Sequence, residues 1–535
     1  MKLVLTITRG SLEGRSFPLE SGFLTIGRSE NCTVRFDSTQ ERIASKQHAF
    51  IEAKLDGFYL TDNASTNGTL LNGERIAQPA KLNDGDSVQF GRNGLTSTVA
   101  IEQPTAAPSN VDFRRSQLEN YQSAATAEPI NLQNSISNIG LGQLGAETKP
   151  SRAGKYIGIG VTIFAIVFMA LIVVAITFAS VGIGPAIVAS LVAFTPAMLY
   201  LLPFMWLDRY DPEPLWLLAL AFAWGALVAV IFSFVVNTFV GVALTIGISP
   251  DAGQLAGAVF SAPLFEEGSK GFGLVILLIF FRKYFDDVLD GIVFAGVIAL
   301  GFATVENVMY YGTALGEAGI GALIFLFIVR GILSPFAHTT FTAMTGIGCG
   351  IARESHNRFV KLAFPIIGYV FAVTLHAIWN GLAMFSVSLI KRLDLYWMCE
   401  SIGMYGKLEG LCAFLVSYSV LEVPLFLIFV VAAFLIMRRQ NKILKEMLAF
   451  DIARGLIPEA HGKIARSAFR SSGWLLGGLF SGKYRNRSRY LRAIGKLGLS
   501  YWHIQRATAA QGNTGSFQQN PVLREEVLRW RDQVD

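Results

Sequence analysis

The sequence predicts a multi-domain protein with an N-terminal all-β sandwich, a polytopic α-helical membrane domain of about eight spans, and a basic helical cytoplasmic tail. Of its 535 residues, 52% are hydrophobic and 16% are charged, whereas ordinary soluble domains are about 25% charged. The shortage is local, because residues 156–437 hold 27 charged residues among 282 and the other 253 hold 57. This distribution excludes one uniform soluble globule and a long disordered chain, and it indicates a membrane-embedded middle with water-soluble ends.

Residues 1–102 form short apolar runs, such as LVLTI, FLTIG, HAFIEA and SVQFG, separated by Gly, Asn and Asp. This spacing predicts an all-β sandwich. No nucleophile lies beside a base in this stretch, so we expect a binding module. The start, MKLVLTITRG, has too short an apolar run for a signal peptide and no cleavage site, which indicates that the domain stays in the cytoplasm.

Four short motifs follow one another in this domain, in the order GRS, SKQH, STNGT and LNG. Together they resemble the forkhead-associated (FHA) domain, which binds phosphothreonine peptides. The resemblance implies phosphate contacts from three residues, a backbone contact from Asn67, a further polar contact from Lys46 and a structural role for His48. The three phosphate-binding residues are Arg28, Ser45 and Thr66. A phosphate dianion suits a guanidinium with hydroxyl and amide donors on rigid loops, while the alternative is a solvated arginine beside an ordinary turn.

Residues 103–155 are rich in Ser, Thr, Asn, Gln, Ala and Pro, which is typical of a flexible linker. Phosphorylation of Thr105, Thr126 or Thr148 would give the N-terminal domain a target within its own chain. An inert tether is the simpler interpretation.

Residues 156–437 hold apolar segments long enough to cross a bilayer as helices. The predicted spans are 156–179, 184–206, 214–239, 253–281, 288–311, 318–352, 362–389 and 412–437. The sixth is too long for one straight crossing, and its Gly331 and Pro335 predict a kink. With eight spans both termini are cytoplasmic, and the short loops on that side then carry six basic residues against three outside, which agrees with the positive-inside rule.

Residues 438–535 carry 18 basic and 7 acidic side chains and form amphipathic stretches. A basic segment directly after an apolar one is typical of a cytoplasmic flank that touches the anionic bilayer surface. No nucleic-acid recognition motif accompanies the charge, so we expect no nucleic-acid partner. Of the four cysteines, Cys399 and Cys412 flank a short loop and could pair if that loop faces an oxidising compartment.

Ionisable residues accumulate inside the apolar segments, where each costs about 2.5–3.5 kcal/mol to insert. Such a set needs mutual pairing or a water-filled cavity, so a functional site is the first hypothesis. A carboxylate beside an ammonium and a water can act as a general base, and imidazole and amide groups can stabilise an oxyanion. The same Glu and His residues could instead bind Zn²⁺, although the usual HExxH motif is absent.

Further motifs resemble the PrsW family of intramembrane proteases, which is related to the CAAX-prenyl and Abi-type proteases. They are Asp208 to Pro214 (DRYDPEP), Phe265 to Lys270 (FEEGSK), Phe302 to Asn307 (FATVEN), His338, and the pair His376 and Asn380. The resemblance implies a multi-pass cell-membrane endopeptidase that cleaves membrane-protein substrates, such as single-pass proteins of the anti-sigma-factor kind.

Carried over to this chain, the resemblance makes Glu266 the base that activates water, with Glu267 and Lys270 tuning it. Glu306 is the second acidic residue of the site. Three residues would bind water or stabilise the oxyanion, namely His338, His376 and Asn380. We expect no required cofactor, with Zn²⁺ at Glu266, His338 and His376 as the alternative.

Two other functions are alternatives to a protease. A transporter could relay protons through the buried Glu, His and Lys groups, although no convincing internal repeat is visible. A receptor could merely display the FHA-like domain on a membrane anchor. Cleavage of a substrate that depends on Glu266 would separate the protease from both.

Overall fold

The computed structural model describes residues 1–102 except positions 21, 30, 31, 55 and 64, residues 152–392 except 356, residues 418–509 and residues 516–534, with a few positions between 397 and 416. Residues 103–151 of the predicted linker, with its three threonines, lie outside the described residues. Contacts divide the chain into two compact units. The first joins the N-terminal domain with residues 448–459 and 500–528, and the second holds the membrane helices with residues 460–499 and 529–535.

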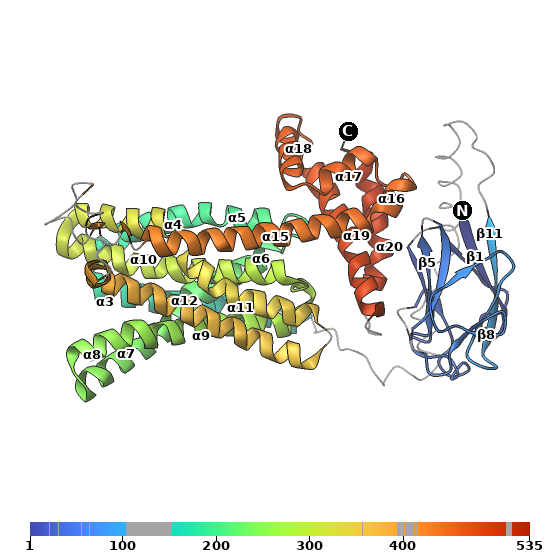
Figure 1. The fold of residues 1–535 in the computed structure, drawn as a ribbon, viewed down its shortest axis with the longest axis horizontal. Helices are drawn as coiled ribbons and strands as arrows, with labels where there is room; N and C mark the ends of the chain where they lie inside the picture. Colours follow the sequence, from blue (N-terminus) through green and yellow to red (C-terminus); the bar gives the residue numbers. More distant parts are fainter. Residues whose placement is uncertain are drawn as a thin grey trace. The chain divides into compact units, whose positions relative to one another are not determined.

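The N-terminal domain is a β-sandwich (Figure 1). One sheet has the strand order β2-β1-β11-β10-β7-β8 and the other β4-β3-β5-β6-β9. The strands are β1 Lys2–Arg9, β2 Ser16–Leu19, β3 Phe23–Gly27, β4 Val34–Arg35, β5 Ala49–Lys54, β6 Gly57–Asp62, β7 Thr69–Leu71, β8 Glu74–Arg75, β9 Ala80–Leu82, β10 Ser87–Phe90 and β11 Leu95–Glu102. The predicted all-β sandwich is therefore confirmed.

Alternation along the strands explains why this segment folds as a sandwich. In β1, Leu3, Leu5 and Ile7 are fully buried, while the residues between them are partly exposed. Successive side chains of a strand point to opposite faces, so these three enter the space between the two sheets. There they pack with apolar residues of the other sheet, including Ile51 and Leu60.

The second unit consists of long apolar helices. They are α3 Arg152–Val181, α4 Ile183–Tyr200, α5 Leu202–Leu207, α6 Leu215–Ala223, η1 Trp224–Ala229, α7 Val230–Gly247, α8 Pro250–Ala256, η2 Gly257–Ser261, α9 Ala262–Phe280, η3 Arg282–Tyr284, α10 Val288–Leu326, η4 Phe327–Leu333, α11 Ala337–Glu354, α12 Arg358–Arg392, η6 Tyr418–Glu422 and α15 Val423–Met447. All the η segments except the 3₁₀ turn η3 are π-helical.

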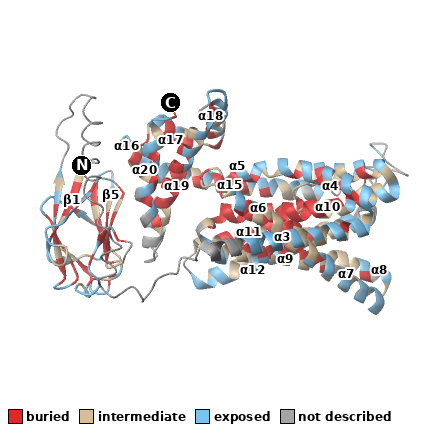
Figure 2. Ribbon diagram, turned by 180° about the vertical axis from the view of Figure 1, so that it is seen from behind, coloured by how far each residue is buried: buried red, intermediate tan, exposed pale blue. Residues whose placement is uncertain are grey.

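Helix α10 is the centre of the membrane unit, and its first half is buried throughout (Figure 2, red). It begins at a capping box, in which the Asp287 side chain accepts hydrogen bonds from the backbone N–H groups of Leu289 and Asp290. The Asp290 carboxylate accepts in return from the Asp287 N–H. Helices α4, α6, α9 and α11 pack around it. Helix α11 approaches most closely where Gly291 faces Gly346.

The predicted sixth span, 318–352, is not one continuous helix. Gly319 adopts φ 78° and ends the first pass of α10, which therefore runs past the predicted boundary at 311. The chain then returns, because Arg330 of η4 reaches Glu306 of the first pass. A second break at Ser334–Phe336 separates η4 from α11. The predicted kink is thus found, and it consists of an interruption of the helix.

Six helical stretches are long and apolar enough to cross a membrane, among the residues that the structure describes. One of them, Val288–Glu354, covers 67 residues and contains both passes on either side of Gly319. The predicted segment 253–281 is helical in α8, η2 and α9 but is not among the six. The number of about eight spans stays a prediction.

The C-terminal part is helical beyond the last predicted span, which ends at Met447 rather than at residue 437. Its helices are α16 Ala449–Ala453, α17 Glu459–Ala465, α18 Ala468–Phe480, α19 Tyr484–Ala509 and α20 Ser516–Arg531. Cys412 is disulfide-bonded, while its predicted partner Cys399 lies outside the described residues.

The contact between α10 and α11 yields a first prediction. A Cβ at Gly291 would lie 2.1 Å from the carbonyl oxygen of Gly346, so Gly291→Ala must push the two helices apart. We expect the free energy of unfolding to fall by about 1–3 kcal/mol, as in other overpacked cores. Unfolding of the purified protein in mixed micelles measures this.

Gly321→Ala is the matched control, because a Cβ there meets nothing within 4 Å. It should leave the stability unchanged or raise it slightly. Equal stability of the Gly291→Ala and Gly321→Ala proteins would contradict the tight contact.

Candidate active site

Helix α9 supplies two carboxylates and an ammonium group to the interior of the membrane unit. Glu266, Glu267 and Lys270 are 7%, 0% and 0% exposed. The Lys270 Nζ donates to Glu267 Oε1 at 2.6 Å, so the ammonium pairs at i,i+3 with Glu267 rather than at i,i+4 with Glu266. The Nζ also lies 4.3 Å above the Phe302 ring. A buried ion pair of this kind needs further hydrogen bonds to be stable.

Glu267 finds those hydrogen bonds on two other helices. His376 of α12 contacts Glu267 Oε1 through Nδ1 at 3.0 Å, and Thr342 of α11 donates its hydroxyl to Oε2 at 2.7 Å. Both oxygens of the carboxylate are therefore occupied. The contact also fixes the His376 ring, which leaves its Nε2 facing Glu266.

A second carboxylate holds the other histidine. His338, in the first turn of α11, contacts Glu306 Oε2 of α10 through Nε2 at 2.9 Å. Arg330 donates Nη2 to the same oxygen at 2.6 Å and Nε to Asn307 Oδ1 at 2.6 Å. The Nδ1 of His338 lies 3.3 Å from Lys270 Nζ. Through these contacts Glu306, which lies in the middle of α10, belongs to the same group of polar side chains.

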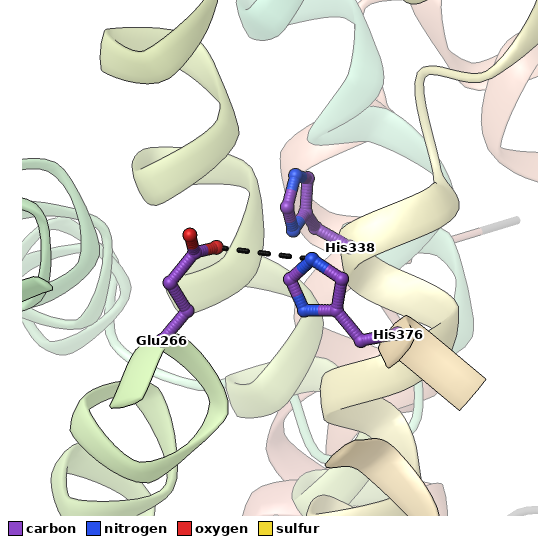
Figure 3. A group of neighbouring side chains, drawn as sticks. All are labelled: Glu266, His338 and His376. Carbon is purple, nitrogen blue, oxygen red and sulfur yellow. Dashed lines mark ion pairs between the residues drawn. The ribbon is translucent and has the colours of Figure 1, made fainter. Parts of the chain in front are cut away.

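Glu266 faces the two neighbouring imidazoles of His338 and His376 from one side (Figure 3). Its Oε2 is 3.9 Å from His376 Nε2, too far for a hydrogen bond, and this buried oxygen has no hydrogen-bond partner among the described residues. One ligand atom from each of Glu266, His338 and His376 lies within 4.8 Å of the others. A buried, unsatisfied carboxylate oxygen beside two imidazoles is a donor set that suits a divalent metal ion such as Zn²⁺.

A cavity of about 320 Å³ adjoins this group. His338 and Asn380 lie in its wall, together with Arg330 and Tyr310. The rest of the lining combines small residues with larger ones, namely Ala258, Ala303, Asn307, Leu326, Val329, Ser334, Pro335, Ala337, Trp379, Ala383 and Met384. The cavity is large enough for a short stretch of peptide next to His338.

Two parts of the predicted set lie away from the carboxylates. The Asn380 amide donates to the backbone carbonyl of Ala258 in η2 at 2.8 Å, so it joins helices and lines the cavity. The segment Asp208 to Pro214 lies between two membrane helices, where Asp208 accepts from the Glu213 N–H. Burial, with Asp208 and Asp211 nearby, raises the pKa of Glu213 to about 9.

Sequence reasoning missed two residues of the site. Thr342 follows His338 by four residues, and this spacing on one helical face could have identified it. Asn237 of α7 lies 3.4 Å from Glu266 Oε1 and accepts from Ser261. A polar amide within an apolar span was the available signal. Arg330 is the ion-pair partner of Glu306.

The predicted phosphopeptide residues gather on neighbouring loops of the sandwich. Ser45 and Thr66 lie side by side, with the Thr66 N–H donating to Ser45 Oγ at 3.0 Å. Arg28 donates Nε to the Ala44 carbonyl, and the Asn67 amide donates to the Ile43 carbonyl at 2.7 Å. Lys46 is exposed beside them.

His48 fixes these loops from inside. It is fully buried, accepts from the Ser45 N–H at 3.0 Å through Nδ1, and contacts the Gly68 carbonyl at 3.1 Å through Nε2. Burial lowers the pKa of His48, which favours the neutral ring that can accept at one nitrogen and donate at the other. The structural role implied for His48 agrees with these contacts.

These features define a protein class: a polytopic membrane protein with a buried carboxylate–imidazole site, joined to a β-sandwich binding domain. Residues 213–406 match the PrsW family of intramembrane metalloproteases, and residues 24–91 match the FHA domain. The membrane part of the chain therefore carries a PrsW-type intramembrane protease domain, and its N-terminal part is an FHA domain.

Individual proteins similar to the chain include two PrsW proteases and a solved FHA domain. The chain is 27% identical over 223 residues to Protease PrsW of Oceanobacillus iheyensis, covering 41% of this chain and 90% of that protein. It is 33% identical over 146 residues to Protease PrsW of Geobacillus kaustophilus, covering 27% of this chain and 58% of that protein. A solved FHA domain from a study of phosphothreonine-dependent interactions is 28% identical, covers 19% of this chain and all of its own, and has a TM-score of 0.17.

The ion pair on α9 yields a second prediction. Lys270→Met would leave the buried Glu267 carboxylate without its cation, so we expect a loss of about 3–5 kcal/mol in the free energy of unfolding. The double variant Glu267→Gln/Lys270→Met removes both charges and should recover most of that loss. Unfolding of the purified proteins in mixed micelles measures both, and a double variant as unstable as Lys270→Met would contradict the pairing.

Proposed function

We propose that this protein is an intramembrane endopeptidase that cleaves membrane-protein substrates, with Glu266 activating the attacking water. The observation that carries the proposal is the buried Glu266 Oε2, which faces His376 Nε2 but bonds to no described residue. A carboxylate left unsatisfied in this way can accept a proton from a water held between it and the imidazole.

The neighbouring groups prepare this chemistry. Glu267 and Glu306 each bind one nitrogen of an imidazole and so hold His376 and His338 in one orientation, with His376 Nε2 facing Glu266 and His338 Nδ1 facing the Lys270 ammonium. Water attacks the scissile carbonyl carbon, Glu266 takes its proton, and the proton passes to the leaving amine as the C–N bond breaks. His338 and Asn380 line the cavity, which supports a role for them in stabilising the carbonyl oxygen of an entering peptide.

A metal-dependent form of the same reaction has specific support. The family is described as a metalloprotease family, and Glu266, His338 and His376 could hold one ion. A bound Zn²⁺ would polarise the substrate carbonyl and lower the pKa of a bound water. Glu267 and Glu306 would then orient the two ligating imidazoles, as outer carboxylates do in zinc sites. The expectation that no cofactor is required stays a prediction, and the family description favours this alternative.

The FHA domain suggests how a partner is brought to the membrane. Arg28, Ser45 and Thr66 present a guanidinium and two hydroxyls from adjacent loops, a set that suits a phosphothreonine dianion. We infer that the domain docks a phosphothreonine protein in the cytoplasm and that the protease cleaves this partner or a neighbour. A single-pass protein of the anti-sigma-factor kind would suit such a circuit, with both termini of the protease cytoplasmic.

The protease proposal predicts that Glu266→Gln abolishes cleavage. Removing a general base costs about 10²–10⁴-fold in rate. Membrane proteomics of cells with the native protein or with Glu266→Gln would show substrates that accumulate uncut in the variant. Unchanged profiles would favour a transporter or a non-catalytic receptor instead.

Chelation and metal analysis of the purified protein separate the two mechanisms. If the site binds Zn²⁺, the native protein should retain about one ion and the His376→Ala variant should lose it. Cleavage that survives thorough chelation would contradict the metal-dependent form and leave the Glu266 mechanism standing.

The FHA proposal predicts that Arg28→Ala weakens binding of a phosphothreonine peptide about 10- to 100-fold, because charge-assisted hydrogen bonds contribute about 1.5–3 kcal/mol each. Calorimetry with the phosphorylated and unphosphorylated forms of one peptide measures this. The exposed Arg42→Ala, on a neighbouring loop, serves as the control. Equal binding of both peptide forms to the native domain would contradict the proposal.

A further inference from the structure

Helix α18, Ala468–Phe480, has an exposed apolar face. Phe469, Leu476 and Phe480 are 76%, 57% and 94% exposed, and Leu479 is 57% exposed. Steps of seven and four residues place the first three on one side of a helix. Gly473 and Gly477 are also exposed, as is Arg470 near the start of the helix (Figure 2, pale blue on α18).

The opposite face of α18 is already occupied by protein. Ala468, Ser471 and Gly478 are buried, and Trp474 packs against His461 and Tyr490. The helix is therefore mostly apolar, with Arg470 as its one charged residue, and one side remains uncovered. A helix of this composition is stable when its remaining side also lies in an apolar medium.

Two contacts place α18 at the end of a membrane helix. The Trp206 indole N–H donates to Ser472 Oγ at 2.9 Å, and the Trp206 and Phe469 rings lie 6.2 Å apart. Trp206 is next to the last residue of the candidate span Ile183–Leu207. Tryptophan at the end of a span is typical of the interface between hydrocarbon and headgroups, so α18 starts at that depth.

The charge around α18 indicates which lipid it meets. Residues 460–499 contain nine basic residues and no Asp or Glu. Arg466 and Arg470 flank the start of the helix, and Lys483 and Arg485 follow its end. A basic border around an apolar face is the arrangement by which helices lie on anionic bilayers.

We propose that α18 is an interfacial anchor, which inserts Phe469, Leu476, Leu479 and Phe480 into the acyl boundary of the bilayer while the flanking Arg and Lys side chains bind anionic phospholipid headgroups. The anchor ties the C-terminal helices to the membrane surface beside the span that ends at Trp206. This inference is independent of the proteolytic mechanism, because none of these residues belongs to the active site.

A fluorescent label at position 480 tests the proposal in the full-length protein. Phe480→Cys changes a side chain that is 94% exposed, whereas Cys32 and Cys349 are buried and Cys412 is disulfide-bonded, so a thiol-reactive dye is directed to the new cysteine. The protein is placed in nanodiscs of phosphatidylcholine with or without phosphatidylglycerol. Brominated acyl chains then report by quenching whether the dye enters the bilayer.

We expect the dye at position 480 to be quenched, and more strongly when phosphatidylglycerol is present. A dye at Lys54→Cys, at the exposed end of strand β5 in the β-sandwich, should not respond. Arg470→Gln should lower the ratio of inserted to free helix by about fivefold, since a basic residue near an anionic surface contributes about 1 kcal/mol. The parent protein treated with the same dye gives the background.

Two outcomes would overturn the proposal. A dye at position 480 that is quenched no more than the dye at position 54 would show that this face meets no lipid. Disulfide-linked dimers of Phe480→Cys without lipid quenching would show that a second copy of the chain covers the face. Amide hydrogen exchange of residues 468–480 in the unlabelled protein, slower in nanodiscs with phosphatidylglycerol than without, gives a check that needs no substitution.

Discussion

The carboxylate of Glu267 is the constraint on which the membrane unit depends. It is fully buried, and a buried charge is tolerated only when it is paired and hydrogen-bonded. Its partners come from its own helix and two others: Lys270 of α9, Thr342 of α11 and His376 of α12. One charged group thus fixes the mutual rotation of three helices, and the imidazole that it holds belongs to the proposed active site.

The two domains solve a similar problem by similar means. In the FHA domain a buried neutral His48 holds the loops that carry Ser45 and Gly68. In the membrane domain two carboxylates hold His376 and His338. In both places a buried polar neighbour orients residues of the candidate site. Such preorganisation suits a site that must act without rearranging.

The sequence predicted the sandwich and most of the site, because both depend on local patterns. The alternation of apolar and polar residues in β1 indicates which side chains are buried. The spacing of Glu266 and Lys270 places them on one face of a helix. The sequence left open whether Lys270 pairs with Glu266 or with Glu267, since i,i+3 and i,i+4 partners are both within reach. Asn237 was missed because a single amide carries no spacing signal. The return of the chain at Gly319 was also hidden, because the apolar composition continues across it.

The interruption at Ser334–Phe336 has an electrostatic consequence. The break frees the backbone carbonyls of Gly331 and Leu333. The hydroxyls of Tyr200 and Tyr418 donate hydrogen bonds to these carbonyls and so stabilise the interruption. Because of it, a new helix starts deep inside the apolar unit, with His338 in its first turn. The partial positive charge at the amino end of α11 is then directed at the gathered carboxylates. Part of the counter-charge for this acidic centre is therefore provided by peptide dipoles, which no side-chain substitution can remove.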